Sequence, residues 1–233
     1  MGVLGDERPE ALLARLHARS DAQIEEMSRR RPDPADAARS VEERLARAKV
    51  FVSDKLVALD RDKAEFCYQM CRAFRARRIV EIGTSWGVSN LYLAAAVRDT
   101  VAVHGGTGLV IGTEHEPGKL AEARANLAEA GFESFVELRE DDLRRTLTTL
   151  EGPVDFVLVD IWTDMARPGL ERVAPHLARE AVVVCDNTAA HRDAYADYFA
   201  FIDDPANGFR TLTLPFAGGL EFSVRSPIAN KSQ

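Results

Sequence analysis

Apolar side chains recur at helical spacing in the first third of the chain. This spacing predicts three helices, at about residues 9–30, 36–52 and 61–74. Prolines interrupt the pattern at residues 31–35, between the first two helices. We therefore expect residues 1–55 to form an N-terminal helical extension, either a lid or a dimer contact, and residues 56–228 to form a single domain.

From residue 78 onward the pattern changes to short apolar runs separated by helical stretches. The runs predict strands at residues 78–82, 109–113, 135–139, 156–160 and 182–186. The stretches between them predict helices at about residues 89–98, 119–130, 143–150 and 170–178. Alternating strands and helices are typical of a parallel sheet that is covered by helices on both faces.

The end of the chain departs from this alternation. After a predicted helix at about residues 191–202, two apolar runs at 209–214 and 220–225 are joined by the short segment 215–219. Such a short turn cannot carry a crossover helix, so these strands should pair antiparallel. We therefore predict an α/β fold: a Rossmann-like, doubly wound, seven-stranded and mostly parallel sheet with a C-terminal antiparallel hairpin, plus N-terminal helices.

Composition narrows the class of partner and the compartment. The chain carries 37 acidic and 30 basic residues, a net charge of −7, so no overall field attracts a nucleic acid. No apolar stretch reaches the roughly 18 residues of a membrane helix, and the first residues do not resemble a signal peptide. Three cysteines in a chain with a full core are expected to be reduced thiols, which predicts a cytoplasmic protein.

A glycine-containing turn follows the first predicted strand, in the segment 80–89 (VEIGTSWGVS). Gly83 and Gly87 lack the Cβ atoms that would keep a ligand away from the backbone. Their spacing differs from the G-x-G-x-x-G of dinucleotide sites. Glu81 adds a carboxylate that disfavours a pyrophosphate and favours the sulfonium of S-adenosylmethionine. The alternative is that Glu81 only pairs with a neighbouring arginine, Arg77 or Arg78.

Acidic residues also follow the second and third strands. Glu114 comes at the end of the second strand, where a carboxylate can accept hydrogen bonds from the ribose hydroxyls of a nucleoside. Asp141 and Asp142 follow the third strand, where one of them can accept from an adenine amino group. For these two residues, capping of the next helix is an equally good interpretation.

A second acidic group follows the last two parallel strands. Asp160 ends one strand, and Asp186 and Asn187 end the other. If the strands are neighbours, their ends lie about 4.8 Å apart and the side chains converge. Oxygen ligands of this kind suit Mg²⁺, Mn²⁺ or Ca²⁺. The alternative is that Asp186 caps the following loop and Asp160 binds substrate without a metal.

Four segments together resemble the class I methyltransferases of the catechol O-methyltransferase and caffeoyl-coenzyme A O-methyltransferase type. They are the pattern Glu81-x-Gly83-x-x-x-Gly87-x-Ser89, the strand ending at Glu114, segment 160–164 (DIWTD) and segment 186–188 (DNT). Segment 214–220 is similar to the last hairpin of that group. The resemblance covers about residues 55 to 226.

The resemblance implies transfer of a methyl group from S-adenosylmethionine to a hydroxyl of a small, catechol-like acceptor, assisted by a divalent metal, with Mg²⁺ first among the candidates. Such a metal would lower the pKa of the hydroxyl and fix it near the methyl group. The family usually has lysine where this chain has Thr163, and that lysine takes part in deprotonating the acceptor. Its absence leaves the metal alone, or His191, as the candidate base.

The residues predicted for each role follow from the motifs and the resemblance. The cofactor residues are Glu81, Gly83, Thr84, Ser85, Gly87, Ser89, Glu114, His115, Asp141, Asp142, Asp160 and Trp162; the catalytic residues are Asp160 and His191; the metal ligands are Asp160, Asp186 and Asn187. Trp162 is expected to wall the pocket or to be plain core. Three alternatives stay open: a metal-independent methyltransferase on another small acceptor, a nicotinamide-dependent oxidoreductase, and a non-catalytic cofactor-binding homologue. The expected partner is a small-molecule acceptor, and a homodimer is compatible with the sequence.

Overall fold

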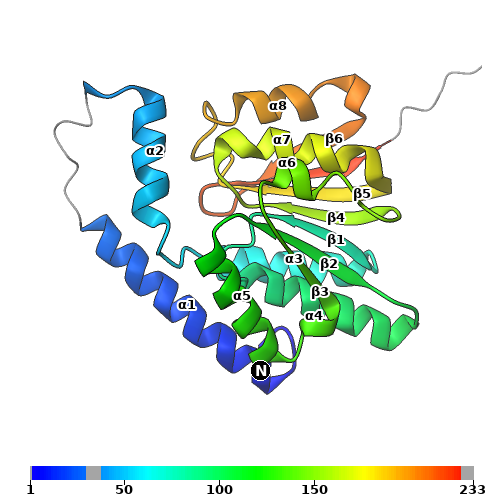
Figure 1. Cartoon of the computed structure of the whole chain (residues 1–233). Helices are drawn as coiled ribbons and strands as arrows, with labels where there is room; N and C mark the ends of the chain where they lie inside the picture. The colour runs from blue at the N-terminus through cyan, green and yellow to red at the C-terminus, as the bar shows by residue number, and fades with distance from the viewer. Residues whose placement is uncertain (1, 30–37, 227–233) are drawn as a thin grey trace, which may run out of the picture.

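A seven-stranded sheet forms the centre of the molecule in a computed structural model that describes residues 2–29 and 38–226 (Figure 1). The strand order is β3-β2-β1-β4-β5-β7-β6, in which β1 to β5 run parallel and β7 pairs antiparallel with both β5 and β6. The strands are β1 (Arg78–Ile82), β2 (Leu109–Glu114), β3 (Val136–Glu140), β4 (Val154–Val159), β5 (Leu177–Asp186), β6 (Phe209–Leu214) and β7 (Leu220–Arg225). The predicted fold is confirmed.

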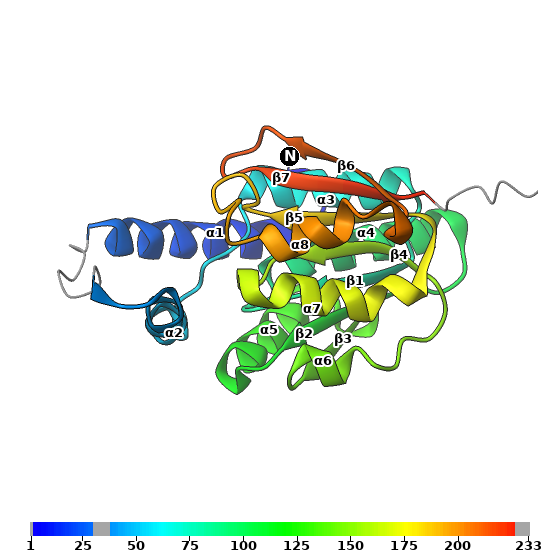
Figure 2. The ribbon, with the colours of Figure 1, turned by 90° about the horizontal axis from the view of Figure 1, so that it is seen from above.

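Helices cover both faces of this sheet (Figures 1 and 2). They are α1 (Glu7–Ser28), α2 (Val41–Val52), α3 (Arg61–Ala73), α4 (Val88–His104), α5 (Pro117–Ala130), α6 (Leu143–Thr146), α7 (Thr163–Val173) and α8 (Ala196–Ile202). Within residues 2–29 and 38–226, no helix combines the length and the apolar character needed to cross a membrane. The predicted interruption at residues 31–35 lies outside the described residues.

The alternation of side chains along the parallel strands separates two hydrophobic cores. In β1, Ile79 packs into the core beneath α1, α3, α4 and α5, whereas Val80 and Ile82 pack into the core beneath α6, α7 and α8. Successive side chains of a strand point to opposite faces, so a strand buried on both faces reads as a continuous apolar run. By the same alternation, Glu81, two residues after Ile79 in β1, faces the side of the sheet that α3 and α4 cover.

The helix before β5 begins earlier than the sequence predicted. We expected a helix over residues 170–178, but α7 spans Thr163–Val173, and a short 3-10 helix, Ala174–His176, leads directly into β5. Pro168 lies inside α7, a position that local propensity disfavours. The α7 face that includes Leu170 is buried in the core beneath α6, α7 and α8. This burial stabilises the helix despite the proline. The last helix is also shorter than predicted, because turns occupy residues 187–195.

The two N-terminal helices differ in how they contact the rest of the molecule. The leucines of α1, Leu12, Leu13 and Leu16, are buried in the same core as α3 and α4. In contrast, none of the α2 side chains that the structure describes is fully buried. Figure 2 shows α2 and the end of α1 projecting from the body of the molecule. Tertiary packing therefore ties α1 to the domain, whereas α2 stands to one side.

Candidate active site

The turn after β1 brings the backbone close to the neighbouring strands. Gly83 has φ +98°, and a Cβ atom there would lie 2.1 Å from the backbone carbonyl oxygen of Asp160. Gly87 has φ +80° and packs against Ala123 of α5. The backbone N–H of Thr84 donates to the carbonyl of Thr113 at 2.9 Å. The turn is therefore fixed in a conformation that an L-residue with a side chain resists at position 83.

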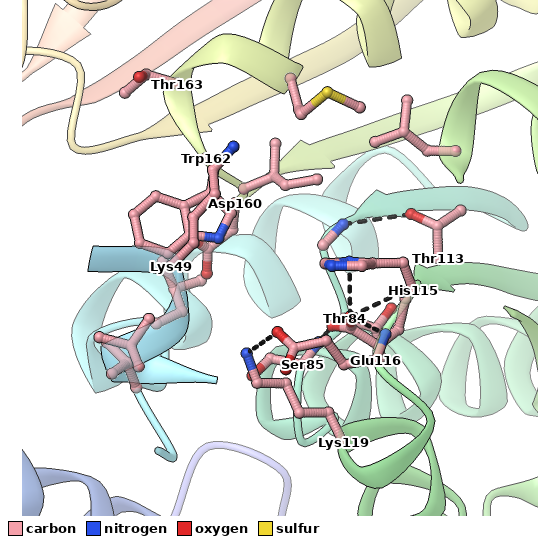
Figure 3. A pocket seen from close by; sticks show the side chains of 18 of the residues that line it. Lys49, Thr84, Ser85, Thr113, His115, Glu116, Lys119, Asp160, Trp162 and Thr163 are labelled. Carbon is pink, nitrogen blue, oxygen red and sulfur yellow. Dashed lines mark hydrogen bonds and ion pairs between the residues drawn. The ribbon is translucent and has the colours of Figure 1, made fainter. Parts of the chain in front are cut away.

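A cavity of about 670 Å³ opens at the carboxyl ends of the central strands, where open α/β sheets bind ligands (Figure 3). Most residues predicted for the site line it: Gly83, Thr84, Ser85, Ser89, Glu114, His115, Asp141, Asp142, Asp160, Trp162, Asn187 and His191. Three predicted residues, Glu81, Gly87 and Asp186, are not part of its lining. The helix α2 also contributes to the wall, through Leu45, Lys49 and Val52.

The carboxylate of Glu114 organises the loop on one side of the cavity. Its Oε2 accepts from the backbone N–H of Ser85 at 2.9 Å, and its Oε1 accepts from those of His115 and Glu116 at 2.8 and 2.9 Å. A carboxylate offers about four lone-pair positions; His115 Nδ1 also lies 3.3 Å from Oε1, so the position that remains is on Oε2, which has one donor. The residue is nearly buried, at 8% exposure. This geometry suits the predicted acceptance of a ribose hydroxyl, which stays a prediction.

Glu81 lies behind the turn and does not reach the cavity. The side chain is fully buried and accepts a hydrogen bond from Asn90 Nδ2 of α4 at 2.7 Å. Burial raises the pKa of Glu81 to about 7, although hydrogen bonds to its carboxylate partly oppose the rise. The alternative, an ion pair with Arg77 or Arg78, is absent among the described residues, since Glu81 bonds Asn90. One oxygen thus faces Asn90 of α4, whereas Oε1 has no hydrogen-bond partner among the described residues, so the predicted contact of Glu81 with the cofactor stays a prediction.

Both aspartates after β3 line the cavity, and one of them also caps a helix. Asp142 caps α6 by accepting from the backbone N–H of Arg144 at 2.9 Å and also pairs with the Arg144 guanidinium. The hydrogen bonds from Arg144 lower the pKa of Asp142 to about 2. Asp141 has φ +133° and lies 3.2 Å from Arg145. The capping alternative is therefore realised at Asp142, and both residues line the cavity.

The second acidic group forms as the strand order requires. β4 and β5 are neighbours, with Val159 opposite Cys185, so Asp160 and Asp186 follow side by side. The Nδ2 of Asn187 donates to Asp186 Oδ2 at 2.7 Å. Burial raises the pKa of Asp160 well above its usual range, and the nearby carboxylates of Asp186 and Glu81 raise it further. The predicted convergence of these side chains is present.

A residue that sequence reasoning missed lies among these acids. Lys63, in the first turn of α3, is fully buried, and its Nζ donates to Asp186 Oδ1 at 2.6 Å and pairs with Asp60 Oδ2 at 2.9 Å. Burial alone would lower the pKa of Lys63, but hydrogen bonds to Asp186 and Asp60 more than offset this, so its pKa is raised. The available signal was its position four residues before Cys67, on the apolar stripe of the helix.

The residues present do not fit a divalent metal at the predicted position. Both oxygens of Asp186 already accept hydrogen bonds, one from Lys63 and one from Asn187. The remaining Asn187 oxygen lies 3.5 Å from the Lys63 ammonium. A metal ion that used these oxygens would meet a fixed positive charge among its own ligands.

The outer part of the cavity is formed by α2 and the start of α7. Lys49 Nζ pairs with Asp164 at 2.8 Å and lies 5.7 Å from the centre of the Trp162 ring. Figure 3 shows Lys49 beside Trp162, which lines the cavity and is thus not plain core. Thr163 also lines the cavity. His191 is exposed at the cavity wall, and its backbone N–H donates to the carbonyl of Asn187.

A parallel sheet with an antiparallel seventh strand and a cavity at the carboxyl ends of its central strands has the architecture of a class I methyltransferase. Residues 80–188 match the family model described as a methyltransferase domain. The chain is 32% identical over 132 residues to catechol O-methyltransferase from Mycobacterium tuberculosis (strain ATCC 25618 / H37Rv), a match that covers 56% of this chain and 57% of that relative. The predicted resemblance to the class I S-adenosylmethionine-dependent O-methyltransferases is confirmed.

Solved structures share the fold at low sequence identity. The cofactor-bound Rv0187 from MTB is 24% identical with a TM-score of 0.65, over 84% of this chain and 99% of that chain. The O-methyltransferase from Bacillus cereus in complex with SAH is 16% identical with a TM-score of 0.64, over 91% of this chain and 100% of that chain. At these identities the likeness concerns the fold alone. The chain spans less than two thirds of the length of its curated relatives.

Proposed function

We propose that this protein transfers a methyl group from S-adenosylmethionine to a hydroxyl of a small acceptor. The observation that carries the proposal is the pairing of the Gly83 turn with the Glu114 carboxylate across one cavity. Its volume of about 670 Å³ is in the range of small-molecule sites. Trp86 lines the same cavity, and its buried indole N–H has no acceptor among the described residues, as expected of a donor that a ligand satisfies.

The roles of the residues follow from their positions. In this proposal Glu114 accepts from a ribose hydroxyl through its open lone pair, and the turn at Gly83 and Ser85 holds the amino-acid end of the cofactor. S-adenosylmethionine supplies the reactive methyl group when bound. The protein then mainly orients the two partners and excludes water. His191, exposed at the wall, is the proposed base that takes the hydroxyl proton.

The acceptor is proposed to be small and catechol-like. The support is the curated relatives, which are catechol O-methyltransferases. Trp162 offers an aromatic face at the cavity for a planar ring. Because Lys63 already engages two of the three predicted metal ligands, Asp186 and Asn187, we favour the metal-independent form of this proposal over the form that requires Mg²⁺.

Calorimetric titration and a methylation assay test this function. We expect S-adenosylhomocysteine to bind with a micromolar or lower dissociation constant and NADH to show no heat, because the glycine spacing of the turn differs from that of dinucleotide sites. Incubation with S-adenosylmethionine and a panel of catechols should add one methyl group by mass spectrometry, and the pH dependence of turnover should change in His191→Ala. Binding of NADH alone would support an oxidoreductase, and binding of S-adenosylhomocysteine without any turnover would support a non-catalytic homologue.

We further propose that residues 1–55 act as an N-terminal extension whose second helix covers the cavity. The support is the position of α2, which contributes Lys49 to the wall while its described side chains stay only partly buried. The Lys49–Asp164 pair joins α2 to the start of α7, next to the cavity. Closure of this kind would exclude water from the transfer step.

Removing the Lys49 side chain is expected to weaken this cover. The pair is partly exposed, at 34% and 45%, so its contribution is at most about 1 kcal/mol. In Lys49→Ala we therefore expect the acceptor KM to rise by up to about fivefold, with little change in kcat, and the wild-type KM to rise with salt. The matched control is Arg167→Ala, which removes a similarly exposed pair with Glu171 elsewhere on α7. An unchanged acceptor KM in Lys49→Ala would contradict the proposed cover.

A further inference from the structure

Lys63 is a buried cation surrounded by oxygen atoms. Its ammonium group has three N–H donors. Three side-chain oxygens lie around it: Asp186 Oδ1 at 2.6 Å, Asp60 Oδ2 at 2.9 Å and Asn187 Oδ1 at 3.5 Å. The Lys63 side chain has 0% exposure, whereas Asp60 lies at the surface with 51%. The lysine therefore reaches inward from the start of α3 to the end of β5.

Two of the three oxygens around Lys63 belong to predicted metal ligands, Asp186 and Asn187. Asp186 and Asn187 come from the end of β5, where the sequence predicts metal ligands. The second oxygen of Asp186 accepts from Asn187 Nδ2 at 2.7 Å, so no Asp186 oxygen is left without a donor. An ammonium group and a divalent ion that shared these oxygens would repel each other in a poorly screened interior. The Lys63 ammonium thus already places one positive charge beside these oxygens.

The Asn187 amide is held from several sides. Asn187 has φ +57°, and a Cβ atom on Gly218 would lie 2.3 Å from its Oδ1. The Gly218 carbonyl accepts from the backbone N–H groups of Ala189 and Ala190, which closes the β6–β7 turn over this loop. The amide nitrogen of Asn187 donates to Asp186, and the amide oxygen of Asn187 faces Lys63. The amide is therefore oriented toward the lysine.

We propose that Lys63 takes the place of a divalent metal in this protein, as a fixed cation that orients Asp186 and Asn187 and balances the charge of the Asp160–Asp186 pair. Lys63 does not line the cavity, whereas Asp160 and Asn187 do, so it is a positioning residue that acts through them. The consequence for turnover rests on the proposed methyl transfer. The consequence for cation binding does not, so the two can fail separately.

Titration with Mn²⁺, followed by electron paramagnetic resonance, tests cation binding. We expect the wild type and Asp186→Asn to bind Mn²⁺ equally, because Asp186 forms no Mn²⁺ site while Lys63 is present. In Lys63→Met the acidic oxygens lose their cation, so the Mn²⁺ dissociation constant should fall by at least about tenfold. That gain should be absent in the double variant Lys63→Met/Asp186→Asn and in Lys63→Arg, which keeps the charge. The matched control is Lys55→Met, whose lysine pairs with the exposed Asp54 and should gain no site.

Two results would overturn the proposal. One is a wild-type Mn²⁺ site that is lost in Asp186→Asn or Asp160→Asn. The other is a folded Lys63→Met protein that binds Mn²⁺ no better than the wild type. The wild-type titration needs no variant of Lys63, so it decides the question even where Lys63→Met does not fold. In turnover, we expect chelator dialysis to leave the wild type unchanged and Lys63→Met to require Mn²⁺.

Discussion

Alanine at position 83 is expected to abolish the binding of S-adenosylhomocysteine. Gly83 has φ +98°, which costs an L-residue about 1–2 kcal/mol or more. The added Cβ atom would also lie 2.1 Å from the Asp160 carbonyl oxygen, a backbone atom that cannot rotate away. The turn and the end of β4 must therefore separate. Calorimetry should show a dissociation constant raised by about 100-fold or more, and the free energy of unfolding should fall by about 2 kcal/mol.

Gly118 provides a matched control for this substitution. It lies in the first turn of α5, and a Cβ atom there would meet no atom within 4 Å. Gly118→Ala should therefore bind S-adenosylhomocysteine like the wild type and unfold at the same or a slightly higher temperature, since alanine is favoured over glycine in a helix by about 0.5–1 kcal/mol. If Gly83→Ala is folded and binds S-adenosylhomocysteine within threefold of the wild type, the turn does not form the cofactor site.

Glutamine at position 114 should weaken cofactor binding by about 10- to 150-fold. A hydrogen bond to a charged group contributes about 1.5–3 kcal/mol, and a neutral amide loses most of the charge-assisted part. Glu114 also accepts from three backbone N–H groups, of Ser85, His115 and Glu116. A glutamine has one acceptor oxygen, so at least one of these donors would face an N–H₂ group. The measurement is the dissociation constant of S-adenosylhomocysteine, together with the free energy of unfolding in urea.

Glu137→Gln is the control for the Glu114 variant. Glu137 lies on β3 at 47% exposure and pairs with Arg139, so its loss should change the free energy of unfolding by less than about 1 kcal/mol. Its effect on cofactor binding should be undetectable. Equal affinities of Glu114→Gln and Glu137→Gln for S-adenosylhomocysteine would show that Glu114 serves only the loop.

The strands could be predicted well because their burial leaves a local signal. Parallel strands covered on both faces are continuous apolar runs, and the predicted β1 has the observed bounds. The two antiparallel hairpin strands, β6 and β7, also have the predicted bounds. The boundaries of α7 could not be predicted in the same way. Pro168 disfavours a helix locally, and only packing against the second core decides that the helix includes it.

Candidate site residues at strand ends were also accessible from the sequence. Parallel strands end at one edge, so Glu114, Asp160 and Asn187 were expected to meet a ligand there, and all three line the cavity. The direction of a single side chain was less certain. Glu81 is in step with the α4 face, so one carboxylate oxygen meets Asn90, whereas Oε1 has no partner among the described residues.

The sequence by itself determined the succession of strands and helices along the chain and the positions of the acids at the strand ends, because these depend on local periodicity. It also determined the antiparallel hairpin, because the connection between its strands is short. Only the tertiary structure decided what lies opposite those acids. Lys63 is 123 residues from Asp186 along the chain, and packing of α3 on the sheet brings their side chains to 2.6 Å. Charge balance in a buried site depends on all elements packed around it, and no single segment of sequence contains that information.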